Sequence, residues 1–399
     1  MHSNRTIESL RPIMKDFDSI VLPYWHKFEL PSPYHQYAIG LFIAVVGITG
    51  MCLNLLVIVF FTMFKALRTP SNILVINLAI SDFGFSAVIG LPLKTMAAFN
   101  NFWPWGKTEN ILHNFISNCF VLPLFSNFNK ACTIYGLGGG LFGFVSLSTI
   151  AAIAFDRYLV IATPFESVFQ TTPKRTILIM LFLWLWSLIW TIPPIFGFGR
   201  YVTEGFQTSC TFDYISTDLK NRLFNIGMFG FGFLCPLFLS VFCYARIILI
   251  VRSRGKDFIE MAASSKAGNQ KDKSANVSST KSDTFVLKSS AILLGVFLLC
   301  WTPYAAICLM ALIGYADYIT TTMVELPCLC AKTAAVWDPC IYAFRYPRFR
   351  AIFQSRFGMF GKSKNFTLPT VNKRSDSHHN LKYSIFRMQK LVFFKRLLW

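Results

Sequence analysis

The sequence predicts an all-α fold, a bundle of seven membrane-spanning helices followed by a short amphipathic helix on the membrane surface. Composition is the first reason: of the 399 residues, 54% are hydrophobic and only 14% are charged, whereas soluble domains carry about 25% charged residues. The second reason is the recurrence of long apolar runs, because a bilayer core of about 30 Å needs about 20 residues of apolar helix.

Seven runs of at least that length follow one another along the chain. Five of them carry no charge, the second contains Asp82 and Lys94, and the seventh contains Glu325, Lys332 and Asp338. The runs cover residues 37–64, 73–99, 131–155, 176–199, 223–245, 289–316 and 318–344. We therefore expect a membrane domain over residues 37–345, preceded by an N-terminal segment (1–36) and followed by a helix and tail (346–399).

The distribution of basic residues predicts the orientation of these spans. Lys and Arg are frequent after the first, third and fifth runs and in the tail, and such connections are cytoplasmic in most membrane proteins. The N-terminus is then extracellular, where Asn4 begins an Asn-Arg-Thr glycosylation acceptor. The connection 246–288 would be cytoplasmic, and its part 255–282 is rich in Lys, Ser, Asn and Gly, which predicts a mobile loop.

The basic excess and the cysteines fit a membrane protein. The net charge of +19 falls between and after the apolar runs, which favours membrane topology and argues against a nucleic-acid partner. Several of the eleven cysteines lie inside apolar runs, where a thiol packs as a small hydrophobe.

Two segments do not fit this organisation. Residues 109–130 contain an apolar run, 119–125, that is too short to cross a bilayer. It is either an extended outer loop or sequence from an unspliced transcript or a faulty gene model. The end, 383–399, alternates aromatic, aliphatic and basic residues, which suits contact with an anionic membrane but is also open to the second interpretation.

Lys332 is the most informative single residue. It lies near the middle of the seventh run, where a lysine costs about 2.5–3.5 kcal/mol on insertion scales and is a functional candidate by default. The alternative is a purely structural pairing with a carboxylate of another helix. A desolvated lysine amine becomes a nucleophile that can condense with an aldehyde.

Several motifs around this lysine, in matching register, resemble the opsins. The segment Ala331-Lys-Thr-Ala-Ala-Val-Trp-Asp-Pro-Cys-Ile-Tyr342 resembles the opsin retinal-lysine segment followed by the Asn-Pro-x-x-Tyr motif of rhodopsin-like receptors. Cys300-Trp-Thr-Pro-Tyr304 resembles the sixth-helix motif, Asp156-Arg-Tyr158 ends the third span as in that receptor family, and residues 201–210 resemble the second extracellular loop of opsins.

Within the opsins, the chain is most similar to the invertebrate rhabdomeric, Gq-coupled branch. Gly90-Leu-Pro-Leu-Lys-Thr, the glycine run 138–140 and Phe212-Asp-Tyr-Ile carry this similarity. Tyr346-Pro-Arg-Phe-Arg350 also resembles the branch's His-Pro-Lys-Phe-Arg, with Tyr in place of His.

The resemblance implies that Lys332 holds retinal, either 11-cis-retinal or a hydroxylated or dehydro analogue, as a Schiff base. A buried cation needs a negative partner, but Tyr135 occupies the position where vertebrate visual opsins place Glu. The resemblance therefore assigns the counterion to Glu204, in the second extracellular loop. Glu325, two helical turns before Lys332, is the alternative; otherwise we expect it at the outer aqueous edge, contacting nothing.

The resemblance also implies a disulfide and a pocket. Cys132 and Cys210 would form a bridge on the oxidising outer side, with Cys119 as a competitor. The retinal pocket would be apolar, with aromatic walls and small residues along the polyene. Its implied residues are Tyr135, Gly136, Gly139, Gly140, Gly143, Ser209, Met228, Phe229, Phe233, Phe297, Trp301, Tyr304 and Ala305.

Activation would depend on residues of the inner half. Arg157 would pair with Asp156 or reach Asp283, and opening of these contacts would form a cytoplasmic cleft. Asn54, Asp82 and Asp338 would form a buried polar network, although opsins usually carry Asn where this chain has Asp338. The full implied set for coupling and activation is Asp156, Arg157, Tyr158, Asp283, Asp338, Pro339 and Tyr342.

We therefore expect a light-activated receptor of the plasma membrane rather than an enzyme. Its expected partners are a heterotrimeric G protein of the Gq class, an arrestin, a receptor kinase and membrane lipid. Two alternatives stay open: a retinal photoisomerase or retinoid-binding opsin that couples weakly, and a chemoreceptor of the same fold without retinal.

Overall fold

The computed structural model describes residues 5–14, 17–104, 130–163, 172–264, 270–345 and 347–357. The chain divides into two units, residues 1–350 and 351–399, and the helix bundle belongs to the first. Asn4, residues 109–129 of the predicted insertion and the end 383–399 lie outside the described residues.

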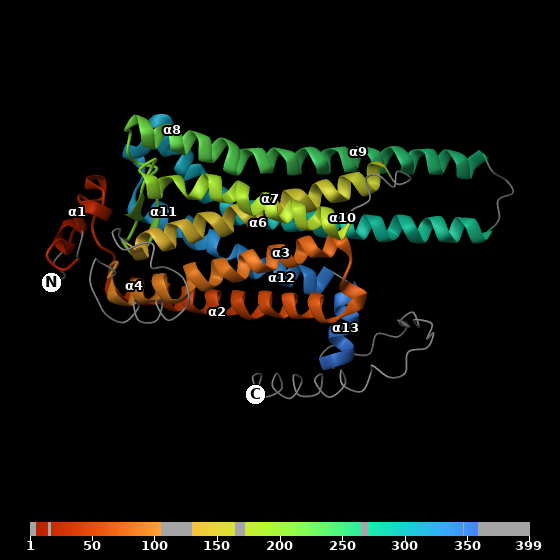
Figure 1. The fold of residues 1–399 in the computed structure, drawn as a ribbon, viewed down its shortest axis with the longest axis horizontal. Helices are drawn as coiled ribbons and strands as arrows, with labels where there is room; N and C mark the ends of the chain where they lie inside the picture. The colour runs from red at the N-terminus through yellow and green to blue at the C-terminus, as the bar shows by residue number, and fades with distance from the viewer. Residues whose placement is uncertain are drawn as a thin grey trace. The chain divides into compact units, whose positions relative to one another are not determined.

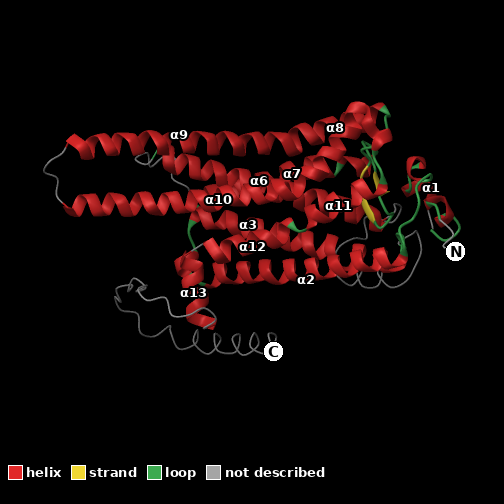
Figure 2. Cartoon of the chain, turned by 180° about the vertical axis from the view of Figure 1, so that it is seen from behind, coloured by secondary structure: helices red, strands yellow, loops and turns green. Residues whose placement is uncertain are grey.

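Long helices lie lengthwise beside one another in the first unit (Figures 1 and 2). Six stretches in the described part of the chain are long and apolar enough to cross a membrane. Three of these spans consist of a single helix: α2 (Pro33–Met63), α6 (Lys130–Ala162) and α7 (Pro173–Thr191). The other three contain π turns. They are α3 (Pro70–Phe85) with η4 (Ser86–Lys94) and α4 (Thr95–Asn100), α8 (Leu219–Gly227) with η7 (Met228–Leu234) and α9 (Cys235–Ser264), and α10 (Gln270–Met310) with η8 (Ala311–Tyr315).

A seventh span follows in two halves, α11 (Thr321–Lys332) and α12 (Ala334–Arg345), which meet at Thr333. Each half contains a proline, Pro327 and Pro339, and proline removes a backbone hydrogen bond and kinks a helix. Lys332 is the last residue of the first half. Short elements complete the fold: η1 (Ile7–Leu10), α1 (Phe17–Ile20), η2 (Pro23–Trp25), η3 (Lys65–Leu67), η6 (Pro193–Phe196), η9 (Ala316–Tyr318) and α13 (Pro347–Phe357).

Three of the long helices begin earlier than the apolar runs predicted, because a capping pair precedes each run. Ser32, Thr69 and Thr172 are the N-cap residues, each followed by proline, and each side-chain oxygen accepts a hydrogen bond from a backbone N–H three residues later. Hydroxyl caps and first-turn prolines are both favoured at helix starts. Because the residues at these positions are polar, the apolar runs do not include the first residues of the helices.

The prediction of a mobile loop over residues 255–282 is wrong for most of that segment. Helix α9 continues to Ser264 and α10 begins at Gln270, and both extend beyond the neighbouring helices (Figures 1 and 2). Many residues here are Lys, Ala, Glu, Gln and Met, which have good helix propensity.

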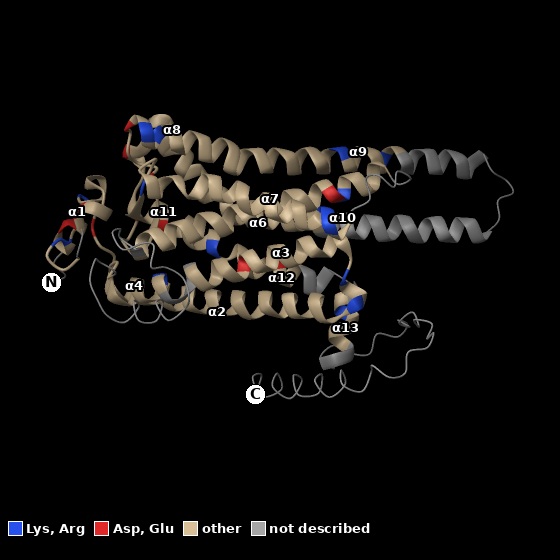
Figure 3. Cartoon of the chain, viewed as in Figure 1, with Lys and Arg blue, Asp and Glu red and all other residues tan. Residues whose placement is uncertain are grey.

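Charge is concentrated toward the ends of the helices, and long stretches between carry none (Figure 3). Apolar side chains such as Leu181, Leu185 and Phe238 are exposed on these stretches, as contact with lipid requires. The five charged residues inside the predicted spans, Asp82, Lys94, Glu325, Lys332 and Asp338, are all buried. Helix α6 contributes most to the interior, since 61% of its apolar window is buried.

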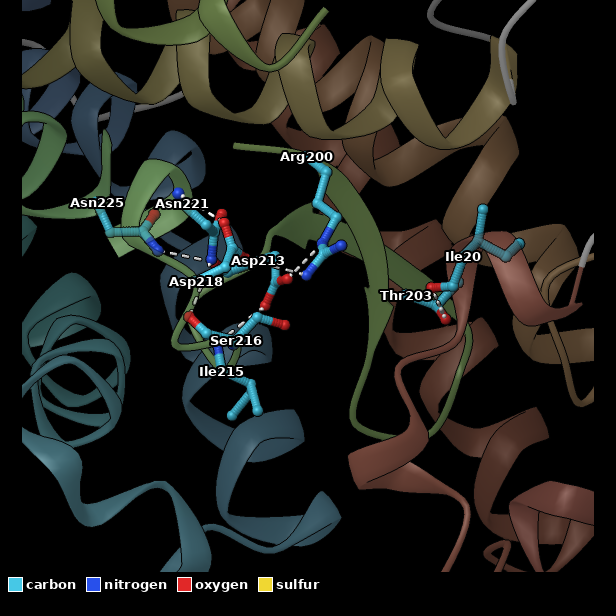
Figure 4. A network of polar contacts seen from close by, with 9 residues as sticks. All are labelled: Ile20, Arg200, Thr203, Asp213, Ile215, Ser216, Asp218, Asn221 and Asn225. Carbon is cyan, nitrogen blue, oxygen red and sulfur yellow. Dashed lines mark hydrogen bonds and ion pairs between the residues drawn. The ribbon is translucent and has the colours of Figure 1, made fainter. Parts of the chain in front are cut away.

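A two-stranded antiparallel hairpin lies at one end of the bundle, here called the hairpin end. Strand β1 (Tyr201–Glu204) pairs with β2 (Ser209–Phe212), so that Glu204 faces Ser209 across the turn. Asp213 anchors the hairpin to α8: its carboxylate accepts from Arg200 at 2.6 Å, and its carbonyl accepts from Asn221 and Asn225 at 2.7 Å each (Figure 4).

The N-terminal segment packs on the hairpin end, which its polar composition did not predict. Ile7, Leu10, Phe17 and Trp25 are buried in the same apolar cluster as residues of α6 and the hairpin. The Thr203 hydroxyl donates to the carbonyl of Ile20 at 3.0 Å (Figure 4). Apolar residues at positions 7, 10, 14 and 17, at helical spacing, were the available signal.

Candidate functional site

A mainly apolar cavity lies inside the bundle below the hairpin. Helices α6, α10 and α11, the π turns η7 and strand β2 supply its walls. Of the predicted pocket residues, those on the cavity wall are Tyr135, Gly136, Gly139, Gly140, Gly143, Met228, Phe229, Phe233, Phe297, Trp301, Tyr304 and Ala305. Lys332 and Glu204 also line it. Ser209 is not among the lining residues.

Lys332 supplies the one amine on this wall among the described residues. Its side chain is 8% exposed, and Nζ donates to Cys328 Sγ at 2.7 Å, one helical turn earlier. Nζ also lies 5.9 Å from the centre of the Tyr135 ring. Lys332 is the last residue of α11 and is among the residues that line the cavity.

Glu204, the last residue of β1, supplies the carboxylate of the site. Its Oε2 accepts hydrogen bonds from the hydroxyls of Tyr304 at 3.0 Å and Tyr214 at 3.2 Å. Its Oε1 accepts from the Cys328 thiol at 3.6 Å. Cys328 thus stands between Glu204 and Lys332.

The ionisation of Glu204 reflects opposing influences. Burial raises the pKa of this carboxyl above its usual range, Lys332 opposes the rise, Glu325 adds to it, and the Tyr304 hydroxyl and Lys94 lower it. Desolvation alone would favour the neutral acid. A positive charge in the cavity therefore favours the ionised form of Glu204, and burial opposes it.

A disulfide holds the hairpin over the cavity. Cys132 of α6 and Cys210 of β2 are bonded, with their Cα atoms 5.4 Å apart, as the resemblance to the opsins implies. Cys119, the competitor, lies outside the described residues. The bridge ties β2 to the helix that supplies most of one cavity wall.

Glycines on α6 make room where aromatic residues approach. A Cβ added to Gly136 would lie 2.2 Å from the Tyr201 ring, and one added to Gly143 would lie 3.2 Å from Trp301. Trp301 itself stacks on Phe297, with ring centres 5.7 Å apart, and meets Phe85 edge-on at 5.9 Å. A side chain at either glycine would displace the aromatic wall.

Sequence reasoning missed several residues of the site. Among those on the wall are Phe85, Trp190, Tyr201, Thr211, Cys308 and Cys328. Cys328 was within reach of the sequence, because a residue four positions before Lys332 lies one turn away on the same helix face. Tyr214, which donates to Glu204, comes from the segment after the hairpin, and nothing local in the sequence predicted that contact.

The expectation that Glu325 faces the outer aqueous edge and contacts nothing is wrong. Glu325 is 1% exposed, and its Oε1 lies 2.5 Å from Nζ of Lys94. Lys94 also donates to the hydroxyl of Ser209. Ser209, which was predicted to line the pocket, contacts this lysine. Lys94 of the second span and Glu325 of the seventh span therefore form an ion pair.

The residues predicted for activation lie farther along the bundle, in its other half. The guanidinium of Arg157 lies 3.5 Å from the carboxylate of Asp156, which is the local one of the two predicted pairings. The ring of Tyr158 packs against that of Phe242, with ring centres 6.2 Å apart. Pro339 lies inside α12. The side chains of Asp283 and Tyr342 are outside the described part of the structure.

The predicted polar network is only partly assembled by the described contacts. Asp82 accepts from the Ser146 hydroxyl at 2.7 Å, which links α3 to α6. Asn54 donates to the carbonyl of Ala335 at 2.7 Å, which links α2 to α12. Asp338 is buried at 2% exposure. The side chains of Asp82 and Asp338 also lie within hydrogen-bonding distance of each other, so the network joins α3 to α12 as well.

This combination defines a class: a seven-span membrane protein whose mainly apolar cavity is lined by a single lysine amine among the described residues. The family described as "7 transmembrane receptor (rhodopsin family)" matches residues 53–342. The rhodopsin of Enteroctopus dofleini is 39% identical over 335 residues, which cover 84% of this chain and 68% of that protein. The chain therefore belongs to the rhodopsin family, as an opsin of the invertebrate Gq type.

Other relatives agree with this placement. A protein described as "Rhodopsin, GQ-coupled" from Mizuhopecten yessoensis is 36% identical over 339 residues, which cover 85% of this chain and 63% of that protein. The crystal structure of squid rhodopsin superposes with a TM-score of 0.74 at 35% identity, covering 85% of this chain and 90% of that one. The predicted seven-span all-α fold is confirmed.

Proposed function

We propose that this chain is a light-activated receptor that holds retinal covalently on Lys332, with Glu204 as its counterion, and activates a heterotrimeric G protein of the Gq class. One observation carries the proposal: a buried lysine amine and a buried carboxylate, separated by one thiol, face the same apolar cavity. Such a cavity suits a long apolar ligand with one reactive end.

The residues present fit retinal. The aromatic walls and the glycines of α6 leave a slot that side chains at Gly136 or Gly143 would fill. The hydroxyl of Tyr135 is buried and has no partner among the described residues, so it can donate to a group placed there. Retinal, when bound, would supply the light-absorbing polyene and the aldehyde that condenses with an amine.

The chain's own residues have separable roles in this proposal. Lys332 provides the attachment point, and Glu204 offsets the positive charge that remains at that nitrogen. The hairpin, held by the Cys132–Cys210 bridge, excludes water from the charge pair. Trp301 lies against both the cavity and the apolar cluster of the other half of the bundle, so a change in ligand shape displaces residues on that side.

The remaining partners follow from the proposed topology. The N-terminus and hairpin end face the outside of the plasma membrane, and Arg157 faces the cytoplasm together with the ends of α9 and α10. The G protein docks there, and an arrestin and a receptor kinase act on the same side. The chromophore is 11-cis-retinal or a hydroxylated or dehydro analogue.

Reconstitution tests the whole proposal. The full chain is expressed, incubated with 11-cis-retinal in the dark, and its absorption spectrum and light-dependent nucleotide exchange on a Gq-class protein are measured. We expect a retinal-dependent visible band and exchange that requires light. A band without exchange would indicate a photoisomerase or retinoid-binding opsin, and the absence of any band would indicate a chemoreceptor.

Arg157→Ala separates light absorption from signalling. Arg157 lies at the end of α6 remote from the cavity and pairs with Asp156, so its removal leaves the charges around Lys332 unchanged. We expect an unaltered dark spectrum and at least a tenfold loss of light-driven nucleotide exchange. Loss of the pigment band itself would show that the arginine is needed for folding, and the exchange assay would then say nothing about coupling.

A further inference from the structure

A second buried lysine lies above the cavity and is not explained by the proposed function. Lys94, the last residue of η4, is 0% exposed, and its ammonium lies 2.5 Å from the carboxylate of Glu325 in α11. It also donates to the hydroxyls of Thr208 at 2.9 Å and Ser209 at 3.3 Å. A lysine has three N–H donors, and all three are used here.

Lys94 therefore joins three separate parts of the chain: the second span, the seventh span and the hairpin. The turn of the hairpin also lies close to Glu325. Gly205, at its turn, has a φ of +53°, and a Cβ added there would lie 3.3 Å from Glu325 Oε2. We call Lys94, Glu325, Thr208 and Ser209 the Lys94 clasp.

Two carboxylates, those of Glu204 and Glu325, lie near Lys332, and the clasp pairs Glu325 with Lys94. Glu325 is seven positions before Lys332, about two helical turns along the same face. Two lysines, Lys94 and Lys332, and two acids, Glu204 and Glu325, are buried at this end, so their formal charges sum to zero. The other titratable groups packed around them are Tyr135, Tyr214, Tyr304, Cys308 and Cys328.

We propose that Lys94 is a positioning residue of the chromophore site, which fastens the hairpin over the cavity and neutralises Glu325 so that Glu204 alone serves Lys332 as counterion. The fastening is a property of the apoprotein. The counterion selection rests on the proposed function. Neither role requires Lys94 to touch the ligand, and it is absent from the cavity wall.

The fastening is tested on the full-length apoprotein, without retinal, by a double-mutant cycle of thermal unfolding. Removing one member of a buried ion pair strands the other charge, whereas removing both is often nearly neutral. We expect Lys94→Met and Glu325→Gln each to lower the unfolding temperature by roughly 5 °C or more. The double variant should recover at least half of that loss.

The exposed pair of Arg11 and Glu8, whose side chains are 42% and 46% exposed, is the matched control. Arg11→Met and Glu8→Gln should change the unfolding temperature little, because exposed pairs contribute little. If the single variants of the clasp do not fold, a folded double variant gives the same support. A double variant no more stable than the weaker single variant would overturn the fastening role.

The counterion role is tested by pH titration of the reconstituted pigments in the dark. Glu325→Gln leaves the Lys94 cation unpaired beside Glu204, so the visible band should convert to the ultraviolet form at a pH at least one unit lower than in the wild type. Adding Lys94→Met removes that cation and should restore the wild-type midpoint. A midpoint that stays low in the double variant would show that Glu325 itself is the counterion.

The two proposals fail in different ways. A wild-type chain that forms no retinal-dependent band would refute the proposed function, yet the unfolding cycle of the apoprotein would still decide whether the clasp exists. A normal pigment combined with additive unfolding effects would retain the function and overturn the clasp.

Discussion

A Lys332→Ala variant should bind no retinal covalently and show no visible band. Lys332 supplies the one amine on the cavity wall among the described residues, and alanine leaves nothing there that condenses with an aldehyde. The measurement is acid trapping of the incubated protein, followed by mass spectrometry of its peptides. The expected effect is complete loss rather than a reduced yield.

Lys94 is the relevant control, because it is the other fully buried lysine in the described part of the bundle. It lies outside the cavity wall and is held by Glu325, so its ammonium is not available as a nucleophile. Lys94→Met should therefore retain the covalent adduct. Retinal trapped on Lys94 in the Lys332→Ala variant would contradict this assignment and move the attachment site to the clasp.

Much of the architecture could be predicted because the bilayer is a demanding solvent. A charge in a long apolar run is costly, so the run lengths indicated the spans and the isolated charge at Lys332 indicated a site. The motifs then supplied the pocket residues, since Trp301, Tyr304 and the glycines of α6 are placed by the register of their helices. These inferences needed only local sequence and its resemblance to a family.

The remainder depended on contacts between distant segments. Lys94 and Glu325 are 231 positions apart, and each alone resembles a lone charge near the end of a span. Tyr214, which donates to Glu204, directly follows Asp213, whose carbonyl is bonded to two asparagines of α8 (Figure 4). Pairings of this kind arise from the folding of loops, and no periodicity along one helix encodes them.

In two segments the polar composition predicts less structure than the chain forms. The N-terminal segment carries both signs of charge, yet Ile7 and Trp25 are buried against the hairpin end. Residues 255–264 were predicted to lie in a loop, yet they continue α9. In the first segment a few apolar residues at helical spacing were enough to pack against the hairpin end, and in the second helix propensity favours the helix despite the polar composition.

A Glu204→Gln variant reconstituted with retinal should absorb mainly in the ultraviolet at neutral pH. Glutamine keeps the size of the side chain and can still accept hydrogen bonds from Tyr304 and Tyr214. What it removes is the negative charge that stabilises a cation at the Lys332 nitrogen. A nearby opposite charge is typically worth one to three pKa units, so the midpoint of the visible-to-ultraviolet titration should fall by about 2 to 3 pH units.

Tyr304→Phe is the control for this effect, since it deletes one hydrogen bond to Glu204 and leaves the charge. Its titration midpoint should move by less than half as much as that of Glu204→Gln. The rival assignment gives a different pattern, because Glu325 is already paired with Lys94. An unshifted midpoint in Glu204→Gln, together with a large fall in Glu325→Gln that Lys94→Met does not reverse, would transfer the counterion role to Glu325.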